Sequence, residues 1–235
     1  MIHIEKTDVF GWESAIRGMR NPLNSWDKSD SEFYDVVDDI SFQSYYTTSF
    51  KAGKNDLALM QRLSKAGNDH AKFLRMINVT VDITAPLYWW KEFDTYKVGT
   101  VANSCSTMHK IHAKEFTLDD FSHEHLTNGA LDVLDTIVEH LNFCRRWFLK
   151  GKDKDWWWQM IQLLPSSYNQ KRTVQLNYAV LKNMYFSRRN HKLDEWHTLC
   201  EWMETLPYFT DIVVSPNEAP RRPRYDSDGE VSDID

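Results

Sequence analysis

The stretch "NVTVDITAPLYWWKEFDTYKVGTVANSCSTMHKIH", residues 78–112, decides the fold. Its first part continues an alternation of apolar and polar residues, which predicts a β-strand with one face in a core. The apolar positions are Ile77, Val79, Val81 and Ile83. Pro86 should end this strand, because proline donates no hydrogen bond to a sheet. The second part is rich in hydroxyl, amide, thiol and imidazole groups. Such a polar run directly after a core strand predicts that the run lines a site.

Around this strand the pattern predicts mostly helix. Residues 1–10 are expected to form a first strand. Asn55 or Asp56 is suited to cap a helix that Gly67 closes, and Pro165 should stop a short aromatic helix. Helices are expected at about 11–19, 55–66, 129–149, 153–164, 168–187 and 192–206. The helix at 129–149 has an apolar stripe that consists of Leu134, Ile137, Val138, Leu141 and Cys144. The fold class that follows is α+β, with mixed helices and a small sheet.

Two regions differ in composition. Residues 1–210 are expected to form one folded domain. Residues 211–235 contain three prolines, show no apolar periodicity and carry five acidic groups among the last ten residues. We expect this segment to be a disordered acidic tail, because it has too little apolar surface to bury.

Charge and cysteine content narrow the functional classes. The formal net charge of −6 argues against non-specific nucleic-acid binding, which requires a basic surface. No apolar run reaches the length that spans a bilayer, so no membrane association is expected. The three cysteines, Cys105, Cys144 and Cys200, lie far apart and form no CxxC pair. Reduced thiols and a cytoplasmic location are therefore expected.

Metal binding is not expected. His109 and His112, followed by His123 and His125, offer imidazoles at close spacing. However, the sequence contains neither an HExxH motif nor a Cys/His finger, and a bound metal needs three or four converging ligands.

Three segments carry candidate ligand contacts, and each also has a structural interpretation. His70 is expected immediately before a strand, either as a strand cap or as a contact in a crevice. The 103–107 run offers hydroxyl and amide groups to a polar ligand, or is a plain polar loop. Arg188 and Arg189 lie where a helix should end, so they complement the helix dipole or bind phosphate.

Taken together, the order and spacing of these segments resemble the flavin-dependent thymidylate synthases. In that family a "D..L...L...G" helix leads into a Glu-His pair and an H-x-x-F strand. A motif with an Arg-His-Arg triplet, two serines and a closing arginine follows, and a late helix carries N-x-x-x-L-R. Here "NDLALMQRLSKAGNDHAKF" matches the first part, "YKVGTVANSCSTMH" covers the motif, and "NMYFSR" matches the late helix. The resemblance spans roughly residues 1–206, at low identity.

The resemblance implies an α+β homotetramer in which FAD lies at subunit interfaces and dUMP stacks on the flavin. NADPH would reduce the flavin, and methylenetetrahydrofolate would give the carbon. By position, Ser106 and Arg188 are implied to contact the nucleotide as catalytic residues. The implied cofactor-binding residues are His70, Asn183, Lys97 and Asn103.

The sequence also departs from the family motif. The Arg-His-Arg triplet is replaced by Tyr96, Lys97 and Val98; the first serine falls at Val101, and the closing arginine at Met108. A hydrogen bond that involves a charged group contributes about 1.5–3 kcal/mol. Losing several arginines would therefore weaken phosphate binding by orders of magnitude unless other cations replace them.

Three hypotheses remain. The first is a divergent enzyme that reductively methylates a pyrimidine nucleotide, dUMP or a relative, with FAD, NADPH and methylenetetrahydrofolate. The second is a catalytically inactive homologue that acts as a binding or regulatory protein. The third is a small helical interaction protein whose match to the family is accidental. Fold resemblance alone does not decide between them.

Overall fold

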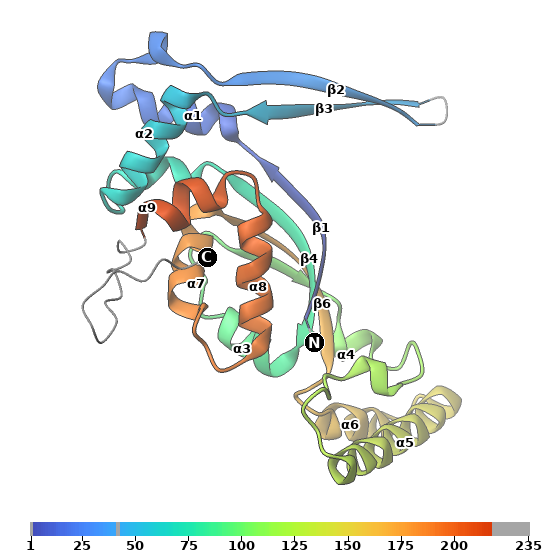
Figure 1. Cartoon of the computed structure of the whole chain (residues 1–235). Helices are drawn as coiled ribbons and strands as arrows, with labels where there is room; N and C mark the ends of the chain where they lie inside the picture. Colours follow the sequence, from blue (N-terminus) through green and yellow to red (C-terminus); the bar gives the residue numbers. More distant parts are fainter. Residues whose placement is uncertain (1, 41–42, 218–235) are drawn as a thin grey trace, which may run out of the picture. The chain divides into compact units, whose positions relative to one another are not determined.

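The structure is a computed structural model that describes residues 2–40 and 43–217 (Figure 1). The chain divides into two compact units. The first unit comprises Met1–Ala15 and Leu74–Pro207, and the second comprises Ile16–Phe73 and the chain from Tyr208 onward. The chain thus enters the second unit early, leaves it, and returns near its end.

The first unit is built on a four-stranded antiparallel sheet. Its strands are β1 (His3–Phe10), β4 (Asn78–Pro86), β5 (Val101–Ser104) and β6 (Asn169–Asn177). The strand order is β1-β4-β6-β5, so β4 and β6 occupy the centre. The two strands predicted at residues 1–10 and 77–86 are therefore confirmed, and the second is a central strand.

The two faces of the sheet differ in polarity, as expected of an antiparallel sheet with one buried side. On one face Val79 pairs with Leu176, and Val81 pairs with Val174; all four are buried. On the other face the Lys171 ammonium forms ion pairs with Glu5 and Asp82. The alternation in the sequence thus sets which side of β4 faces the core.

Helices cover the apolar face. They are α3 (Leu87–Phe93), α7 (Tyr178–Arg188) and α8 (Asp194–Thr205), and α7 and α8 lie side by side in Figure 1. Trp196 of α8 packs against Trp89 of α3, with ring centroids 5.0 Å apart. Both indoles are fully buried. Some of the ten tryptophans are therefore part of the core.

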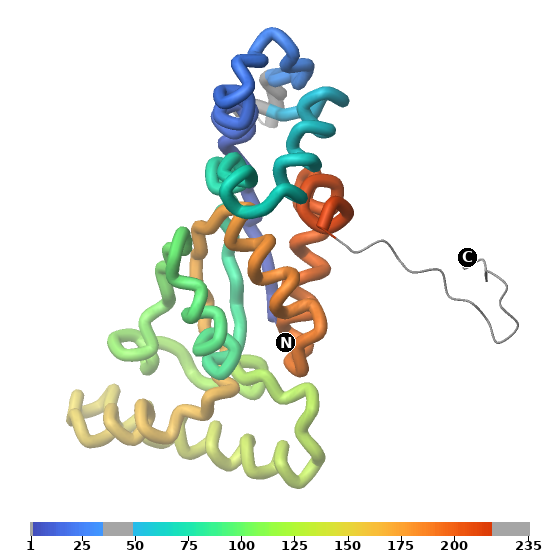
Figure 2. Tube along the Cα trace, turned by 90° about the vertical axis from the view of Figure 1, so that its left-hand side faces the viewer, coloured from blue at the N-terminus to red at the C-terminus, as the bar shows by residue number. Residues whose placement is uncertain are grey.

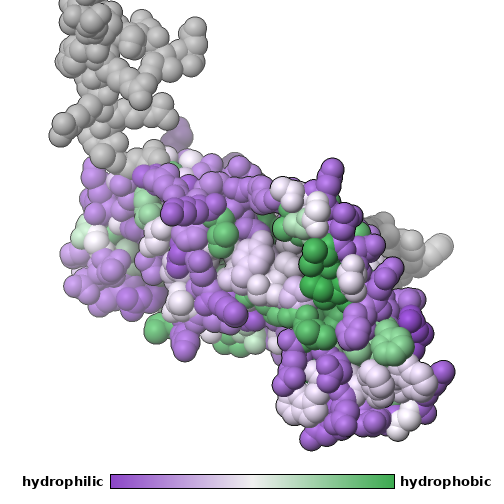
Figure 3. All heavy atoms as spheres, turned by 90° about the horizontal axis from the view of Figure 1, so that it is seen from below, coloured by the Kyte–Doolittle hydropathy of each residue, from purple (hydrophilic) through white to green (hydrophobic). Residues whose placement is uncertain are grey.

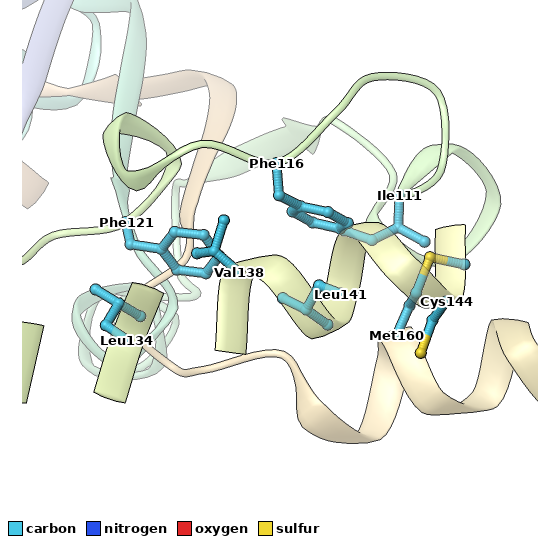
Figure 4. Close-up of a cluster of buried hydrophobic side chains, with 8 residues drawn as sticks. All are labelled: Ile111, Phe116, Phe121, Leu134, Val138, Leu141, Cys144 and Met160. Carbon is cyan, nitrogen blue, oxygen red and sulfur yellow. The ribbon is translucent and has the colours of Figure 1, made fainter. Parts of the chain in front are cut away.

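A second cluster of buried side chains lies around a helical hairpin. Its helices are α5 (Asn128–Gly151) and α6 (Lys154–Leu163), which run side by side in Figure 2. Figure 4 shows the cluster, which contains Ile111, Phe116, Phe121, Leu134, Val138, Leu141, Cys144 and Met160. The apolar stripe predicted for α5 is thus the inner face of the hairpin.

Apolar and aromatic residues also reach the surface seen in Figure 3. Trp147 and Trp158 are exposed.

One predicted helix is wrong in its first half. Residues 169–177 form β6 rather than the start of a helix over 168–187, and α7 begins only at Tyr178. The cause is tertiary pairing: β6 lies between β4 and β5 and shares a full register with β4. Its apolar residues also alternate with period two, which favours a strand.

The second unit contains a hairpin that the sequence did not predict. It consists of β2 (Glu32–Ile40) and β3 (Gln43–Lys51). Its helical elements are α1 (Trp12–Arg20), which begins in the first unit, η1 (Asn21–Leu23), η2 (Trp26–Lys28), α2 (Lys54–Lys65), η3 (Ala71–Arg75), η5 (Thr210–Val214) and α9 (Ser215–Asn217).

Asp56 does not cap α2, contrary to one of the two predictions, and Asn55 does not either; the N-cap residue is Gly53. The Asp56 carboxylate is fully buried and receives a hydrogen bond from Arg20 at 2.6 Å. Gly67 follows the helix with φ +103, which is consistent with its predicted role at the helix end.

The folded part of the chain extends beyond residue 210. Residues 211–217, predicted to belong to the tail, lie in η5 and α9, and Ile212, Val213 and Val214 are buried. The remainder of the predicted tail, residues 218–235, lies outside the described residues.

Candidate functional site

The polar run after β4 forms the edge of the sheet. β5 pairs only with β6, and Asn103 faces Thr173 in the register. All four residues of β5 are exposed, so their side chains are accessible. Gly99 precedes the strand with φ +76, and a Cβ there would lie 3.0 Å from the amide nitrogen of Asn177. The nitrogen concerned is the side-chain Nδ2 of Asn177, the N-cap residue of α7. Glycine at position 99 therefore allows the chain to pass close to this side chain.

A hollow of about 390 Å³ lies beside the start of β5. It is lined by Phe93, Asp94, Tyr96, Lys97, Thr100 and Ala102. Lys97 is exposed and has no partner among the described residues. The Thr100 hydroxyl is buried and likewise lacks a hydrogen-bond partner in the part of the chain that the structure describes. A free cation and an unpaired hydroxyl next to aromatic rings suit a planar, anionic ligand.

Arg188 lies at the end of α7 and contacts this region through Tyr96. Its guanidinium donates to the Tyr96 hydroxyl at 2.9 Å and to the Glu92 carboxylate at 2.8 Å. It also lies over the Trp196 ring, 4.8 Å from the centroid. The guanidinium donors of Arg188 are therefore already used in hydrogen bonds to Tyr96 and Glu92.

Glu92 is the common acceptor of this cluster. Besides Arg188, it accepts hydrogen bonds from the Trp196 indole at 3.2 Å, and the His191 Nε2 lies 3.2 Å away. The Nδ1 of His191 accepts from the Leu193 amide, so its proton lies on Nε2, facing the carboxylate. Three donors therefore surround the Glu92 carboxylate and keep it next to the Arg188 guanidinium.

A second arginine near β5 is also matched by a carboxylate. Arg172 on β6 pairs with Ser104 in the register and donates to Asp94 at 2.7 Å. Its guanidinium lies 4.2 Å from the centroid of the Trp90 ring. Of the three cations around the smaller hollow, Arg188, Arg172 and Lys97, only Lys97 has no carboxylate partner among the residues described.

Ser106 contributes to a different hollow. Its hydroxyl accepts the amide of His109 at 2.9 Å and so caps α4 (Thr107–Lys110). It lines a hollow of about 660 Å³ together with Cys105, Tyr168, Gln170 and other, mostly polar residues. The direct partners of Ser106 and Arg188 are thus different: Ser106 caps α4, and Arg188 contacts Tyr96 and Glu92.

The cations of the larger hollow are neutralised. Lys114 forms an ion pair with Asp120, and Lys171 is held by Glu5 and Asp82. Burial raises the pKa of Tyr168, so its phenol stays protonated and can donate a hydrogen bond. Amides, hydroxyls and paired charges suit a neutral polar group better than a phosphate.

The other predicted site residues are accessible. Asn183 lies on the exposed side of α7, where the Ser187 hydroxyl donates to it at 3.5 Å. His70 belongs to the second unit and is exposed. It does not precede a strand directly, because η3 (Ala71–Arg75) separates it from β4; its amide closes a turn with the Gly67 carbonyl at 3.1 Å.

Sequence reasoning missed the residues that neutralise the arginines. Glu92, Trp196 and Arg172 lie far apart in sequence and meet only through the packing of α3, α8 and β6. For Arg172 the signal was present in the alternation of residues 169–177. For Glu92 the only signal was its four-residue spacing from Tyr96, which places both on one side of a helical turn.

The described ranges contain neither a metal-binding cluster nor a membrane-spanning helix. No group of three or more His, Cys, Asp or Glu side chains is placed to hold a metal ion in residues 2–40 and 43–217. Likewise, none of the helices in those ranges has the length and apolarity that crossing a membrane requires.

Comparison with known proteins gives matches at the level of structure. No protein-family model matches the sequence, and no curated protein matches it. Thymidylate Synthase X (ThyX) from Helicobacter pylori, in a crystal structure with FAD and dUMP, matches with a TM-score of 0.64 at 16% identity. The match covers 93% of this chain and 100% of that chain.

A methylase that acts on UMP and dUMP shares the fold. PolB from Streptomyces cacaoi, a UMP/dUMP methylase bound with 5-Br dUMP, matches with a TM-score of 0.57 at 13% identity. Here the match covers 92% of this chain and 96% of that chain. The α+β prediction is confirmed, and the chain has a fold like that of the flavin-dependent thymidylate synthases.

Proposed function

We propose that this protein binds a pyrimidine nucleotide and a flavin, and that it reductively methylates the nucleotide, dUMP or a relative. One observation carries the proposal: the chain shares its fold, over almost its whole length, with ThyX solved with FAD and dUMP and with a UMP/dUMP methylase. The third hypothesis, an accidental match by a small helical protein, does not account for that coverage.

The smaller hollow fits part of such a ligand set. The aromatic rings of Phe93 and Tyr96 offer a surface for a planar ring, and Lys97 offers a charge to a phosphate. The unpaired Thr100 hydroxyl offers a hydrogen bond that the protein itself does not use. Asn103 and Asn183 are exposed amides able to bond the polar edge of a flavin.

A flavin bound there would supply hydride, with NADPH as the reductant and methylenetetrahydrofolate as the carbon donor. The protein groups bind and orient: Lys97 holds anionic charge, Thr100 and Asn103 orient polar edges, and Arg188 becomes available for phosphate only when it separates from Glu92. Ser106 would act from the larger hollow, and His70 from the second unit. A homotetramer, as the family resemblance implies, belongs to the same proposal.

The test is spectroscopic and enzymatic. The purified protein is expected to show flavin absorbance, either as isolated or after FAD is added. It should also oxidise NADPH only when both dUMP and methylenetetrahydrofolate are present, and mass spectrometry should find the methylated nucleotide. Colourless protein that binds no added FAD would contradict the proposal.

A matched pair of variants locates the activity. Lys97→Ala removes the free cation of the hollow and should raise the KM for the nucleotide about tenfold, the effect of losing one charged hydrogen bond. Lys91→Ala removes an exposed lysine on α3 that does not line the hollow, so its kinetics should match the wild type. Equal effects of both variants would place the nucleotide elsewhere.

The Arg188–Glu92 pair favours a second candidate, a non-catalytic nucleotide-binding protein. With both arginines of the region held by carboxylates, nucleotide affinity depends on Lys97 and neutral donors. This candidate predicts measurable dUMP binding without NADPH oxidation under any combination of cofactors. Detection of turnover that depends on nucleotide and folate would exclude it.

A further inference from the structure

A hollow of about 580 Å³ lies entirely within the second unit. Its lining comes from the end of α1, from the η1–η2 segment and from α2. Its lining residues are Arg20, Leu23, Ser25, Lys28, Asn55, Ala58, Leu59 and Arg62. The sequence singled out only Asn55 among them, as a possible helix cap, and none of them belongs to the candidate site of the first unit. The volume is in the range of small-molecule sites, larger than a single inorganic ion needs.

The rim of this hollow is cationic. Lys28 and Arg62 both line it, both are exposed, and neither has a carboxylate partner among the residues that the structure describes. No carboxylate belongs to the lining. Two unpaired cations that converge on one hollow produce a local positive potential, although the whole chain carries a formal charge of −6.

The nearest carboxylates are bound inside the protein. Asp56 pairs with Arg20 at 2.6 Å and accepts further hydrogen bonds, including the Ser31 hydroxyl at 2.7 Å. Its pKa is lowered: burial alone would raise it, but the hydrogen bonds from Ser31 and Arg20 outweigh that effect. Asp30 accepts the amides of Asn55 and Asp56 and so caps the start of α2. Neither carboxylate lines the hollow or neutralises its rim directly.

The lining of the hollow also contains apolar and neutral polar groups. Leu23, Ala58 and Leu59 are its apolar residues, and the Asn55 side-chain amide offers a donor. The Ser25 hydroxyl accepts from Arg20 at 3.3 Å, which leaves its own proton available. Two cations beside apolar side chains match a ligand with an anionic group on an apolar or ring-shaped body.

We propose that this hollow binds a phosphorylated organic molecule, with the phosphate between Lys28 and Arg62 and the organic part on Leu23, Ala58 and Leu59. A nucleoside monophosphate has this chemistry. The site is independent of the proposed function, because all its residues lie in the second unit, while Lys97 and Arg188 lie in the first.

Isothermal titration of the full-length protein with AMP, inorganic phosphate and adenosine tests the proposal. AMP is expected to bind at least tenfold more tightly than either inorganic phosphate or adenosine, because only AMP can contact both the two cations and the apolar residues of the lining. Lys28→Glu and Arg62→Glu should each weaken AMP binding by at least tenfold. Lys65→Glu is the matched control: it makes the same charge change on α2 outside the hollow and should leave the affinity within about twofold.

Lys97→Glu separates this site from the candidate site. It should leave AMP binding to the hollow of the second unit unchanged, while Arg62→Glu should leave FAD binding unchanged. The proposal is overturned by equal affinity for inorganic phosphate and AMP, which would indicate an adventitious ion only. It is also overturned by the absence of AMP binding at millimolar concentration, or by equal losses in Lys65→Glu and Arg62→Glu while circular dichroism shows intact folding.

Discussion

At the residue scale, Glu92 decides what Arg188 can do. The Glu92 carboxylate accepts hydrogen bonds from Arg188 and Trp196 and lies beside His191. Under the proposed function, an incoming phosphate would compete with Glu92 for the guanidinium. Arg188 would then be available to a phosphate only when this ion pair opens.

Neutralising Glu92 should release Arg188 to the ligand. Glu92→Gln keeps the size and hydrogen-bonding capacity of the side chain but removes its charge. Because a charged hydrogen bond contributes about 1.5–3 kcal/mol, the affinity for dUMP is expected to rise about tenfold in calorimetric titration.

Asp94→Asn is the matched control for this prediction. It makes the same chemical change at the carboxylate that holds Arg172, leaving Arg188 bound to Glu92. Its dUMP affinity should stay closer to that of the wild type. If Glu92→Gln binds dUMP no better than Asp94→Asn, Arg188 is not a ligand to the phosphate.

His112 should make stability depend on pH. Burial lowers its pKa, and the nearby Lys152, Lys110 and Arg145 lower it further. Its buried Nδ1 has no partner among the described residues. The unfolded chain, with an ordinary histidine pKa of about 6.5, therefore binds the proton more readily than the folded one. Stability from this group is complete above that pH and is lost as the pH falls through about 6.5 toward the lowered value.

The measurement is the free energy of unfolding in urea at several pH values between about 5.5 and 7.5. His112→Gln removes the titrating group, so the wild type should lose more stability on acidification than the variant. Parallel curves for the two proteins would show that His112 does not titrate differently in the folded state.

At the element scale, the sequence pattern predicted single helices and strands, but it did not predict which of them pair in the fold. The alternation around Val79 and Val81 predicted β4, and the stripe on α5 predicted its buried face. Residues 169–177 were assigned to a helix because their apolar signal is short, and only pairing with β4 and β5 shows that they form a central strand. The candidate site shows the same limit: Lys97 and Asn103 could be proposed from a polar run, but the neutralisation of Arg188 by Glu92 depends on packing between α3 and α7.

Two glycines allow a matched test of the connections between elements. Gly11 joins β1 to α1 with φ +94, and a Cβ there would overlap the Met76 carbonyl oxygen. Gly67 follows α2 with φ +103, but a Cβ there would meet nothing within 4 Å. Gly67→Ala should cost only the backbone strain of about 1–2 kcal/mol.

Gly11→Ala should lower the free energy of unfolding by at least about twice as much as Gly67→Ala. The reason is that the same backbone strain is joined by a clash with rigid backbone. Denaturant unfolding of both variants checks the difference. Equal losses of stability would mean that β1 can shift away from Met76 without penalty.

At the scale of the whole molecule, the second unit is closed by the end of the described chain. The Tyr208 hydroxyl accepts the amide of Ala52 at 3.0 Å, and its ring packs against Phe50 with centroids 5.5 Å apart. The Gln61 amide donates to the Asp211 carbonyl at 3.2 Å. Segments more than a hundred residues apart thus complete one compact unit.

Truncation separates this closing role from the rest of the C-terminal segment. A chain that ends at Pro207 loses the buried Ile212, Val213 and Val214, each of which contributes about 1.5–3 kcal/mol when fully buried. Hydrogen exchange in α2 should therefore speed up strongly, with little change in β4. A chain that ends at Asn217 is the control and should exchange like the full-length protein; fast exchange in both would assign the role to residues 218–235.

The late return of the chain also bears on how the protein is made. During synthesis, Ile16–Phe73 emerges early and must wait for Tyr208 and Val214, while the whole sheet of the first unit is translated in between. Until then the apolar face of α2 stays open to water and to chaperones. Folding of the second unit should accordingly finish only after residues 208–214 have left the ribosome.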